Sequence, residues 1–255
     1  MADVPSLVRA GRRFLHAEWT AFDGFQTDQD KGLPVPPPQK DAPSGALTIP
    51  LPTVDPSRIG AMPLGEALRR RRSRRRFTED PLSLDELSYL LWATSGIASH
   101  TPKRSLRTAP SGGARHSLDT YLLVFRVEGA RPGIWRYQPY DNAMVLLDEP
   151  ADLAARVDAA LMEQLWNAAV VFVWTTVPYR MEWRYAPVAH KVIALDAGHV
   201  CQNLYLACES IGCGTCALGA YEQKDMDALL GVDGEEEFTL YAAPVGRQVP
   251  KGDDR

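Results

Sequence analysis

Seven arginines occupy the eight positions between Arg69 and Arg76, interrupted only by Ser73. A guanidinium is always charged and presents a planar fork of donors, which suits the oxygens of a phosphate. The whole chain is mildly acidic, with 32 acidic against 28 basic side chains and a formal net charge of -4. The arginines are therefore a local concentration of positive charge. They predict a site for the phosphate of a nucleic acid or of a small cofactor.

Two further segments have the composition of a ligand-binding loop. Residues 109–115 combine small residues with the donors Ser111 and Arg115, so the backbone can approach a ligand that side chains also bind. Residues 212–221 include Gly214 and Gly219, which would likewise expose backbone amides. Each segment is a weak signal alone, because glycine-rich loops are common. Together with the arginines, they indicate a site for a phosphate and a planar ring.

All four cysteines lie within sixteen residues, and Cys213 and Cys216 form a CxxC motif. A redox pair would stand at the start of a helix, and a zinc site would need four well-placed ligands. This motif instead follows a predicted helix, on which Cys201 and Cys208 share one face. We therefore interpret the cysteines as small core residues and expect no metal.

Composition narrows the class of protein. The 255 residues, 45% of them hydrophobic, suffice for a sizeable core. No apolar run approaches the roughly 20 residues that span a bilayer, and the first residues lack the apolar stretch of a signal peptide. We expect a cytoplasmic protein without a membrane partner. A nucleic-acid-binding protein of this size usually carries a wide basic surface, so the acidic balance favours a small cofactor.

The elements that would position these residues follow a mixed α+β order. Residues 1–60 are rich in proline and predict an extended arm after a short helix at about residues 9–21, whereas residues 61–255 predict one domain. Helices are predicted from residue 63 into the arginines and at about 84–95, 152–166, 187–210 and 222–230. Strands are predicted at about 121–127, 133–137, 143–147, 169–176 and 238–245. Gly198, inside the longest helix, indicates close approach by another element. No GxGxxG motif follows a strand, which argues against a Rossmann unit.

The order and separation of several motifs resemble the FMN-dependent nitroreductase superfamily, and more narrowly its SagB-type branch of thiazoline/oxazoline dehydrogenases. The matching stretches are residues 71–77, 90–96, 107–116, 132–137, 195–199, 202–207 and 244–247. The resemblance implies a nitroreductase-like fold, with a central, mostly antiparallel sheet flanked by helices. It also implies an intertwined homodimer with FMN at the subunit interface.

The same resemblance implies three groups of cofactor-binding residues. Those expected to hold the FMN phosphate and ribityl chain are Arg71, Arg72, Ser73 and Arg75, with Arg247 near the phosphate. Those expected to lie against the flavin ring, from the partner subunit in many relatives, are Pro110, Ser111, Gly112 and Arg115. The backbone amide expected to donate to flavin N5 belongs to Leu218, Gly219 or Ala220.

The catalytic candidates are Arg184 and Tyr185, because azoline dehydrogenases place a Lys-Tyr pair before the long helix. Tyr185 matches, but an arginine replaces the lysine. A buried lysine can lose its proton and act as a base, whereas an arginine effectively cannot. Three interpretations stay open. Tyr185 alone handles the proton, Arg184 only anchors an anionic substrate, or the reaction is not azoline oxidation.

The leading hypothesis is an FMN-dependent dehydrogenase that oxidises an azoline-like or peptide-derived biosynthetic intermediate, with oxygen as the electron acceptor. Biosynthetic enzymes would be its partners. The alternative enzyme is an NAD(P)H-dependent nitro- or quinone reductase. Two alternatives belong to other classes: a non-catalytic flavin-binding scaffold in a biosynthetic complex, and a nucleic-acid-binding module that uses the arginines.

Overall fold

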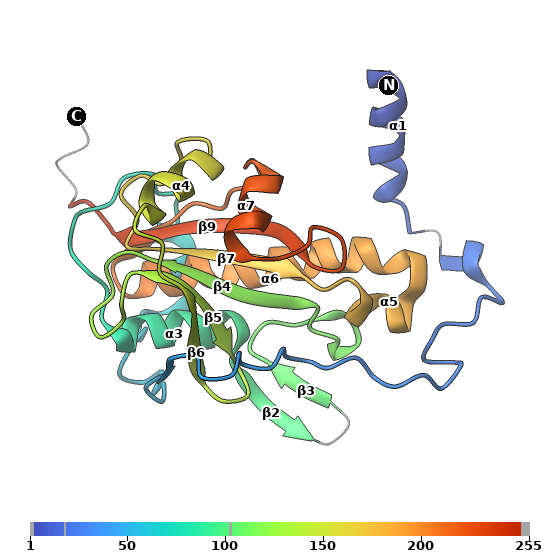
Figure 1. Ribbon diagram of the computed structural model, residues 1–255, viewed down its shortest axis with the longest axis horizontal. Coiled ribbons are helices and arrows are strands. Elements are labelled where there is room, and N and C mark those ends of the chain that lie inside the picture. The colour runs from blue at the N-terminus through green and yellow to red at the C-terminus, as the bar shows by residue number, and fades with distance from the viewer. Residues whose placement is uncertain (1–2, 18, 102–103, 251–255) are drawn as a thin grey trace.

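The computed structural model describes residues 3–17, 19–101 and 104–250. The chain begins with helix α1, Val4–Phe14, which projects from the body of the molecule (Figure 1). The Asp3 side chain caps α1 by accepting a hydrogen bond from the Ser6 amide at 3.2 Å, and Pro5 fits the first turn. The bounds predicted for this helix were therefore wrong. It starts and ends earlier, and a separate 3-10 turn, η1 (Trp19–Phe22), follows.

The proline-rich segment after η1 runs along the surface and forms one short strand, β1 (Thr48–Pro50). Backbone groups tie it to the domain near its middle. The Gln29 amide donates to the Trp183 carbonyl at 2.9 Å, and the Trp183 indole donates to the Leu33 carbonyl at 3.1 Å. Further along, Lys40 forms an ion pair with Glu237. These contacts hold the arm against the end of the molecule that carries Arg184 and Tyr185.

A seven-stranded antiparallel sheet forms the centre, in the strand order β1-β6-β5-β4-β7-β9-β8. Its other strands are β4 (Leu118–Val124), β5 (Gly133–Gln138), β6 (Ala143–Asp148), β7 (Val170–Thr176), β8 (Cys213–Thr215) and β9 (Phe238–Arg247). Every residue of β4 and β7 is buried, which explains the continuous apolar run of β7. The expected α+β fold with a central antiparallel sheet flanked by helices is confirmed.

Alternate residues of the central strands face two separate cores, as the period of a strand requires. Leu122 and Phe172 pack on the face that α3 and α6 cover, whereas Leu123 and Val171 pack on the face that α4 and α7 cover. Figure 1 shows α4 and α7 above the sheet and α3 below it. The long helix α6 is therefore fixed along one face of the sheet.

The helices mostly follow the expected order. Their bounds are α2 (Leu64–Arg70), α3 (Leu84–Ser95), α4 (Leu153–Ala160), α5 (Tyr179–Tyr185), α6 (Ala189–Ser210) and α7 (Gln223–Leu230), with 3-10 turns η2 (Gly112–Ala114) and η3 (Ala186–Val188). Helix α3 begins with a capping box, in which Ser83 and Glu86 bond to each other's backbone amides. The predicted end of α7 at Gly231 is confirmed, since this glycine adopts a left-handed conformation with φ 69°.

Other expectations differ from the structure. Helix α4 ends at Ala160 instead of continuing to residue 166, because Met162 and Glu163 have positive φ angles. Helix α2 forms from residue 64 as expected, but two of its leucines face solvent, since Leu64 is 64% exposed and Leu68 52% exposed. The hairpin of β2 (Ile97–Thr101) and β3 (Arg104–Arg107), strand β8 and helix α5 were not predicted.

Candidate functional site

The predicted phosphate-binding residues meet helix α6 at Tyr205. The Tyr205 hydroxyl accepts a hydrogen bond from the Ala217 amide at 2.8 Å and lies 3.0 Å from the Ser73 hydroxyl, to which it can donate. The Arg71 guanidinium lies over the Tyr205 ring, 5.4 Å from its centroid. One side chain therefore brings the arginine block against the loop that follows α6. We call this group of residues, completed by Leu218, Gly219 and Ala220, the phosphate half-site.

The arginine block divides between the two faces of the sheet on either side of Ser73, which forms a bridge with Thr215 of β8. Arg70 and Arg74 turn toward Glu209 of α6, at 3.2 and 3.9 Å. Arg75 instead lies over Trp166, 5.8 Å from the ring centroid, where α4 and α7 form the other core. The structure thus brings Arg71 and Ser73 together and keeps Arg75 apart from them. Arg75 stays a predicted phosphate ligand that would have to leave Trp166.

Two more predicted cofactor residues have other contacts. Arg72 donates to the carbonyls of Arg69 and Arg71 at 3.2 and 2.7 Å, so its guanidinium folds back on the end of α2. Arg247 forms a two-pronged ion pair with Glu86, in which each guanidinium nitrogen is 2.7 Å from a carboxylate oxygen. That pair ties β9 to the start of α3. The role of Arg247 near a phosphate stays a prediction.

Among the residues that the structure describes, two of the three candidate amides in the loop after α6 have no hydrogen-bond acceptor. The Leu218 amide donates to the Ala242 carbonyl at 2.7 Å, and the Ala242 amide returns a bond at 3.2 Å. The Leu218 amide is therefore already satisfied inside the sheet and is a poor donor for a ligand. Gly219 and Ala220 are exposed, and an added Cβ at Gly219 would meet open space. Between the three, the geometry favours the amides of Gly219 and Ala220.

The predicted ring-binding loop is anchored to another part of α6. The Gly112 amide donates to both carboxylate oxygens of Asp196, at 3.2 and 3.3 Å, and the Ser111 hydroxyl also bonds to this carboxylate. Ser111 in turn accepts a bond from the His116 amide at 2.9 Å. Burial raises the pKa of Asp196, while these hydrogen bonds oppose that shift. The buried Asp196 carboxylate therefore fixes the position of the loop that carries Ser111 and Gly112.

Tyr185 and Arg184 pack directly on this loop. Gly113 has a φ of 58°, and a Cβ there would lie 2.6 Å from the Tyr185 hydroxyl and 3.0 Å from Arg184. Only a glycine allows both the backbone conformation and the close approach. The Trp19 ring stands edge-on to Tyr185, with centroids 5.7 Å apart. The catalytic candidates and the ring-binding loop therefore form one cluster in the same chain, which we call the ring half-site.

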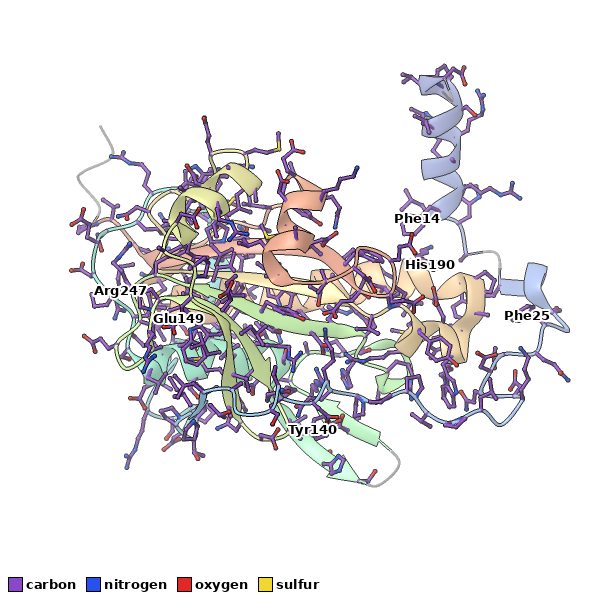
Figure 2. All side chains as sticks on the ribbon, in the orientation of Figure 1. Phe14, Phe25, Tyr140, Glu149, His190 and Arg247 are labelled. Atoms are coloured by element: carbon purple, nitrogen blue, oxygen red, sulfur yellow. The ribbon has the colours of Figure 1, made fainter. Side chains whose placement is uncertain are left out.

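The two half-sites lie on opposite flanks of α6. Asp196 and Tyr205 are nine residues apart, which is two and a half turns of an α-helix and about 14 Å along its axis. Figure 2 places Arg247, at the end of β9, and His190, in the first turn of α6, toward opposite ends of the molecule. One chain therefore presents two separated halves of a site, with the exposed face of α6 between them.

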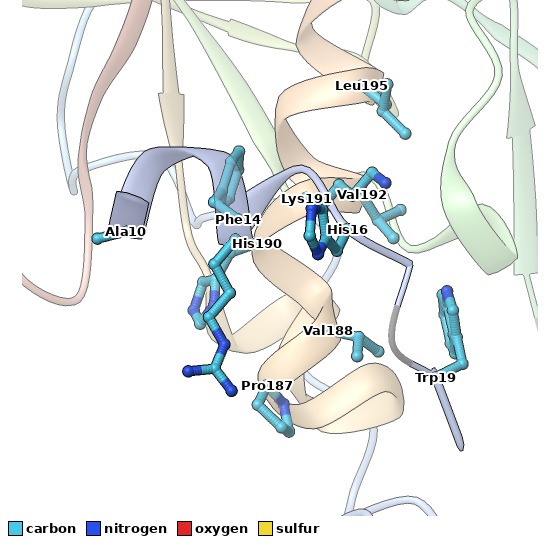
Figure 3. A pocket seen from close by; sticks show the side chains of 11 residues that line it. Ala10, Phe14, His16, Trp19, Pro187, Val188, His190, Lys191, Val192 and Leu195 are labelled. Atoms are coloured by element: carbon cyan, nitrogen blue, oxygen red, sulfur yellow. The ribbon is translucent and has the colours of Figure 1, made fainter. Parts of the chain in front are cut away.

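That exposed face includes Leu195, which is 54% exposed, and Gly198. No heavy atom of the described chain outside α6 lies within 4 Å of a Cβ built at Gly198. The approach predicted at this glycine is therefore not made by the described part of the same chain. A cavity of about 540 Å³ adjoins the face, with Phe14 and His16 beside the first turns of α6 (Figure 3). It contains none of the predicted cofactor residues.

The cysteines are core residues, as interpreted from the sequence. All four are buried and unpaired in disulfides. Burial raises the pKa of Cys201 and Cys213 to about 12, so these thiols stay protonated at neutral pH. Among residues 3–17, 19–101 and 104–250, no group of three metal-ligating side chains could hold a metal ion.

The motif stretches 195–199 and 202–207 contain Asp196 and Tyr205, but the sequence alone assigned a role to neither residue. Both stand on flanks of the core face of α6, where a polar residue needs a partner. That position was a usable signal for Asp196, which is buried at a helical spacing otherwise filled by apolar residues. The partners themselves come from distant loops and could not be read from α6 alone.

Comparisons with known proteins agree with this geometry. The sequence model of the nitroreductase family matches residues 68–247. A protein from Methanocaldococcus jannaschii named as a nitroreductase is 32% identical over 194 residues, which cover 75% of this chain and 94% of the relative. The crystal structure of a nitroreductase from Ralstonia eutropha JMP134 has a TM-score of 0.66 and 26% identity, covering 86% of this chain and 100% of that one.

A chain of the Escherichia coli microcin synthetase McbBCD complex, solved with truncated pro-MccB17 bound, has a TM-score of 0.63 and 17% identity. It covers 96% of this chain and 93% of its own, and at this identity it shows a shared fold. In the described residues, no helix is both long and apolar enough to cross a membrane. The family match over residues 68–247, together with the shared fold, shows that the chain belongs to the nitroreductase family of oxidoreductases.

Proposed function

We propose that the protein is an FMN-dependent oxidoreductase whose flavin binds between two copies of the chain. The observation that carries this proposal is the separation of the two half-sites on opposite flanks of α6. Within a single chain, the two half-sites would have to bind one flavin from opposite sides of α6. A second copy packed on the exposed face of α6 brings the phosphate half-site of one subunit to the ring half-site of the other. A symmetric pair would form two such sites.

The donor set suits FMN. In the phosphate half-site, Arg71 and Ser73 supply a cation and a hydroxyl for the phosphate and ribityl chain, and the exposed amides of Gly219 and Ala220 would donate to a ring nitrogen. In the ring half-site, the small residues of the loop 110–114 permit a flat group to lie close to the backbone. When bound, FMN supplies hydride exchange at N5, and the protein supplies position and charge.

The further proposed assignment is a SagB-type dehydrogenase that oxidises an azoline-like or peptide-derived intermediate and passes electrons to oxygen. Its support is the position of Tyr185, which packs on the Gly112–Gly113 turn with its hydroxyl at the ring half-site. Removing a hydride from such a substrate also requires a base for the proton, and Tyr185 is the proposed base. Arg184 cannot serve as this base, so it would act through its charge.

The second candidate is an NAD(P)H-dependent nitro- or quinone reductase. It is favoured by the name of the Methanocaldococcus jannaschii relative, a nitroreductase, and by the arginine at the position where azoline dehydrogenases have a lysine. A flavin-binding scaffold without turnover in a biosynthetic complex is a third candidate. The microcin synthetase chain, which belongs to such a complex, supports a biosynthetic setting through its fold alone.

The test starts with the visible spectrum of the purified protein after incubation with FMN and removal of free flavin. We expect retained flavin that bleaches on reduction and recovers in air. Steady-state assays then compare oxidation of a synthetic azoline peptide in air with reduction of a nitroaromatic by NADPH. Rapid NADPH turnover without azoline oxidation would favour the second candidate. Retained flavin that turns over neither substrate class would favour the scaffold, and a colourless protein that shifts RNA or DNA would contradict the flavin proposal.

A further inference from the structure

The ring half-site opens into a cavity of about 480 Å³ that joins three parts of the chain. Gln29 and Val35 come from the N-terminal arm, Leu106 from β3, and Trp183 from α5. The hydrogen bonds of Trp183 to the arm, described above, hold these walls together. A cavity of this size suits a small molecule or the end of a peptide.

Three arginines line this cavity, and none of them forms an ion pair with a carboxylate among the residues that the structure describes. Arg107 donates to the Pro38 carbonyl at 3.2 Å. The other two are Arg115, on the loop, and Arg184, at the end of α5. The nearby carboxylates are already engaged elsewhere. Asp119 pairs with Arg180 at 2.6 Å, and Glu182 contacts the His190 ring at 2.7 Å.

The surroundings fix Arg115 and leave its charge uncompensated. Its guanidinium lies over the Trp183 ring, 4.8 Å from the centroid, and its Nε donates to the Arg180 carbonyl at 3.0 Å. Burial and the positive charge of Arg184 both lower the pKa of Arg115. His116 lines the same cavity, and its pKa is lowered to about 4 by burial and by the neighbouring arginines, so it adds no charge at neutral pH.

We infer that Arg115 and Arg184 bind a carboxylate of the substrate, with the apolar part of that substrate against Val35 and Leu106. An anion between two guanidiniums offsets their mutual repulsion and makes charge-assisted hydrogen bonds with donors that are held in place. The substrate class is therefore an organic carboxylic acid, such as a free C-terminus or an amino-acid-derived heterocyclic acid. This inference rests on the proposed function, because the anion is assigned to the flavin site.

The experiment titrates benzoate into the FMN-loaded protein, followed by calorimetry and by the absorbance of the flavin. We expect saturable binding that perturbs the flavin spectrum, and binding of the neutral analogue benzamide that is weaker by about tenfold or more. Arg184→Gln, at an exposed position, should weaken benzoate binding by a similar factor, as should Arg115→Gln. Arg156→Gln, an exposed arginine of α4 on the other face of the sheet, is the matched control and should bind as the wild type does. Circular dichroism of each variant checks folding, and Arg184→Gln carries the test if Arg115→Gln fails to fold.

Several results would overturn the inference. A flavin-loaded wild type that ignores benzoate, or binds benzamide equally well, would contradict the carboxylate site while leaving the flavin proposal intact. Tighter binding of inorganic phosphate than of benzoate would assign the arginines to a phosphate instead. Arginine variants that lose FMN but keep benzoate would place the cations on the cofactor. A wild type that takes up no FMN would contradict the proposed function itself, and the role of the anion as its substrate would fall with it.

Discussion

The backbone amide of Gly112 donates to both carboxylate oxygens of Asp196, so a buried acid of α6 holds the loop that carries Pro110 and Ser111. Nine residues further along α6, Tyr205 performs the equivalent task for Ser73 and the Ala217 amide. One helix therefore positions both half-sites through two polar side chains on its opposite flanks.

Asp196 links the loop to pH. Folding raises the pKa of this carboxyl, so its contribution to stability is complete while it is protonated and is lost as the pH rises through its folded pKa. We expect Asp196→Asn, which keeps an oxygen acceptor without the charge, to unfold at the wild-type temperature or above near neutral pH. The gain in unfolding temperature of the variant over the wild type should shrink as the pH falls toward about 4. Thermal unfolding across this range is the measurement, and a variant that loses stability only at neutral pH would show that the ionised carboxylate is the favoured form.

Asp196→Ala tests the anchor rather than its charge. It leaves the Gly112 amide and the Ser111 hydroxyl without their acceptor, which costs about 1–3 kcal/mol for a buried donor. We expect FMN affinity to fall by about tenfold or more, because the loop loses its fixed position. Equilibrium titration with FMN, followed by fluorescence quenching, measures this effect. Affinity equal to that of the wild type would show that the loop is held by other contacts.

Tyr205→Phe tests the other anchor. The change removes the hydroxyl that binds Ala217 and Ser73 but keeps the ring beneath Arg71. We expect a loss of about 1 kcal/mol in stability and a weakening of FMN binding by about fivefold. Tyr89→Phe is the matched control, because its hydroxyl contacts Ser210 at 3.1 Å outside the half-sites. Equal effects of the two variants on FMN affinity would remove Tyr205 from the site.

Much of the fold could be predicted from local pattern. The apolar run of β7 and the capping box at Ser83 each carry their own signal, and both elements formed where expected. The β2–β3 hairpin carries no such signal: His100 and Leu106 face outward, so apolar alternation is missing. Helix α5 has only seven residues, about two turns, and follows Pro178, so it is too short for its helical period to be detected in the sequence.

The candidate site, like the fold, could be predicted from the sequence only in part. The resemblance supplied Ser73 and Ser111, and the structure gives each a partner on α6. It could not predict how the arginines are distributed, because the opposite directions of Arg71 and Arg75 follow from the bridge between Ser73 and Thr215 of β8, which joins segments distant in the sequence. Nor could it show that the Leu218 amide is already bonded to Ala242, since that pairing joins two segments distant in the sequence.

The exposed face of α6 makes a direct prediction about assembly. Gly198→Ala in a solvated helix should stabilise the protein by about 1 kcal/mol, because alanine is the better helix former. If a second copy packs on this face, Gly198→Ala should instead destabilise the dimer. The larger change Leu195→Asp should then dissociate the dimer and release its FMN. Analytical ultracentrifugation with flavin retention measures both. A Leu195→Asp protein that stays dimeric and yellow would place the interface elsewhere.

The central claim is that each flavin site takes one half from each of two chains, and mixed dimers test it most directly. One subunit carries Arg71→Ala with Ser73→Ala, and the other carries Pro110→Glu, which puts a carboxylate where the flavin ring would lie. Each mutant alone should bind FMN poorly. The purified mixed dimer, made with two affinity tags, should bind one FMN per dimer with wild-type affinity, because one of its sites combines the two unaltered halves. A mixed dimer that binds FMN no better than either parent would contradict the shared site and place the whole of it within one chain.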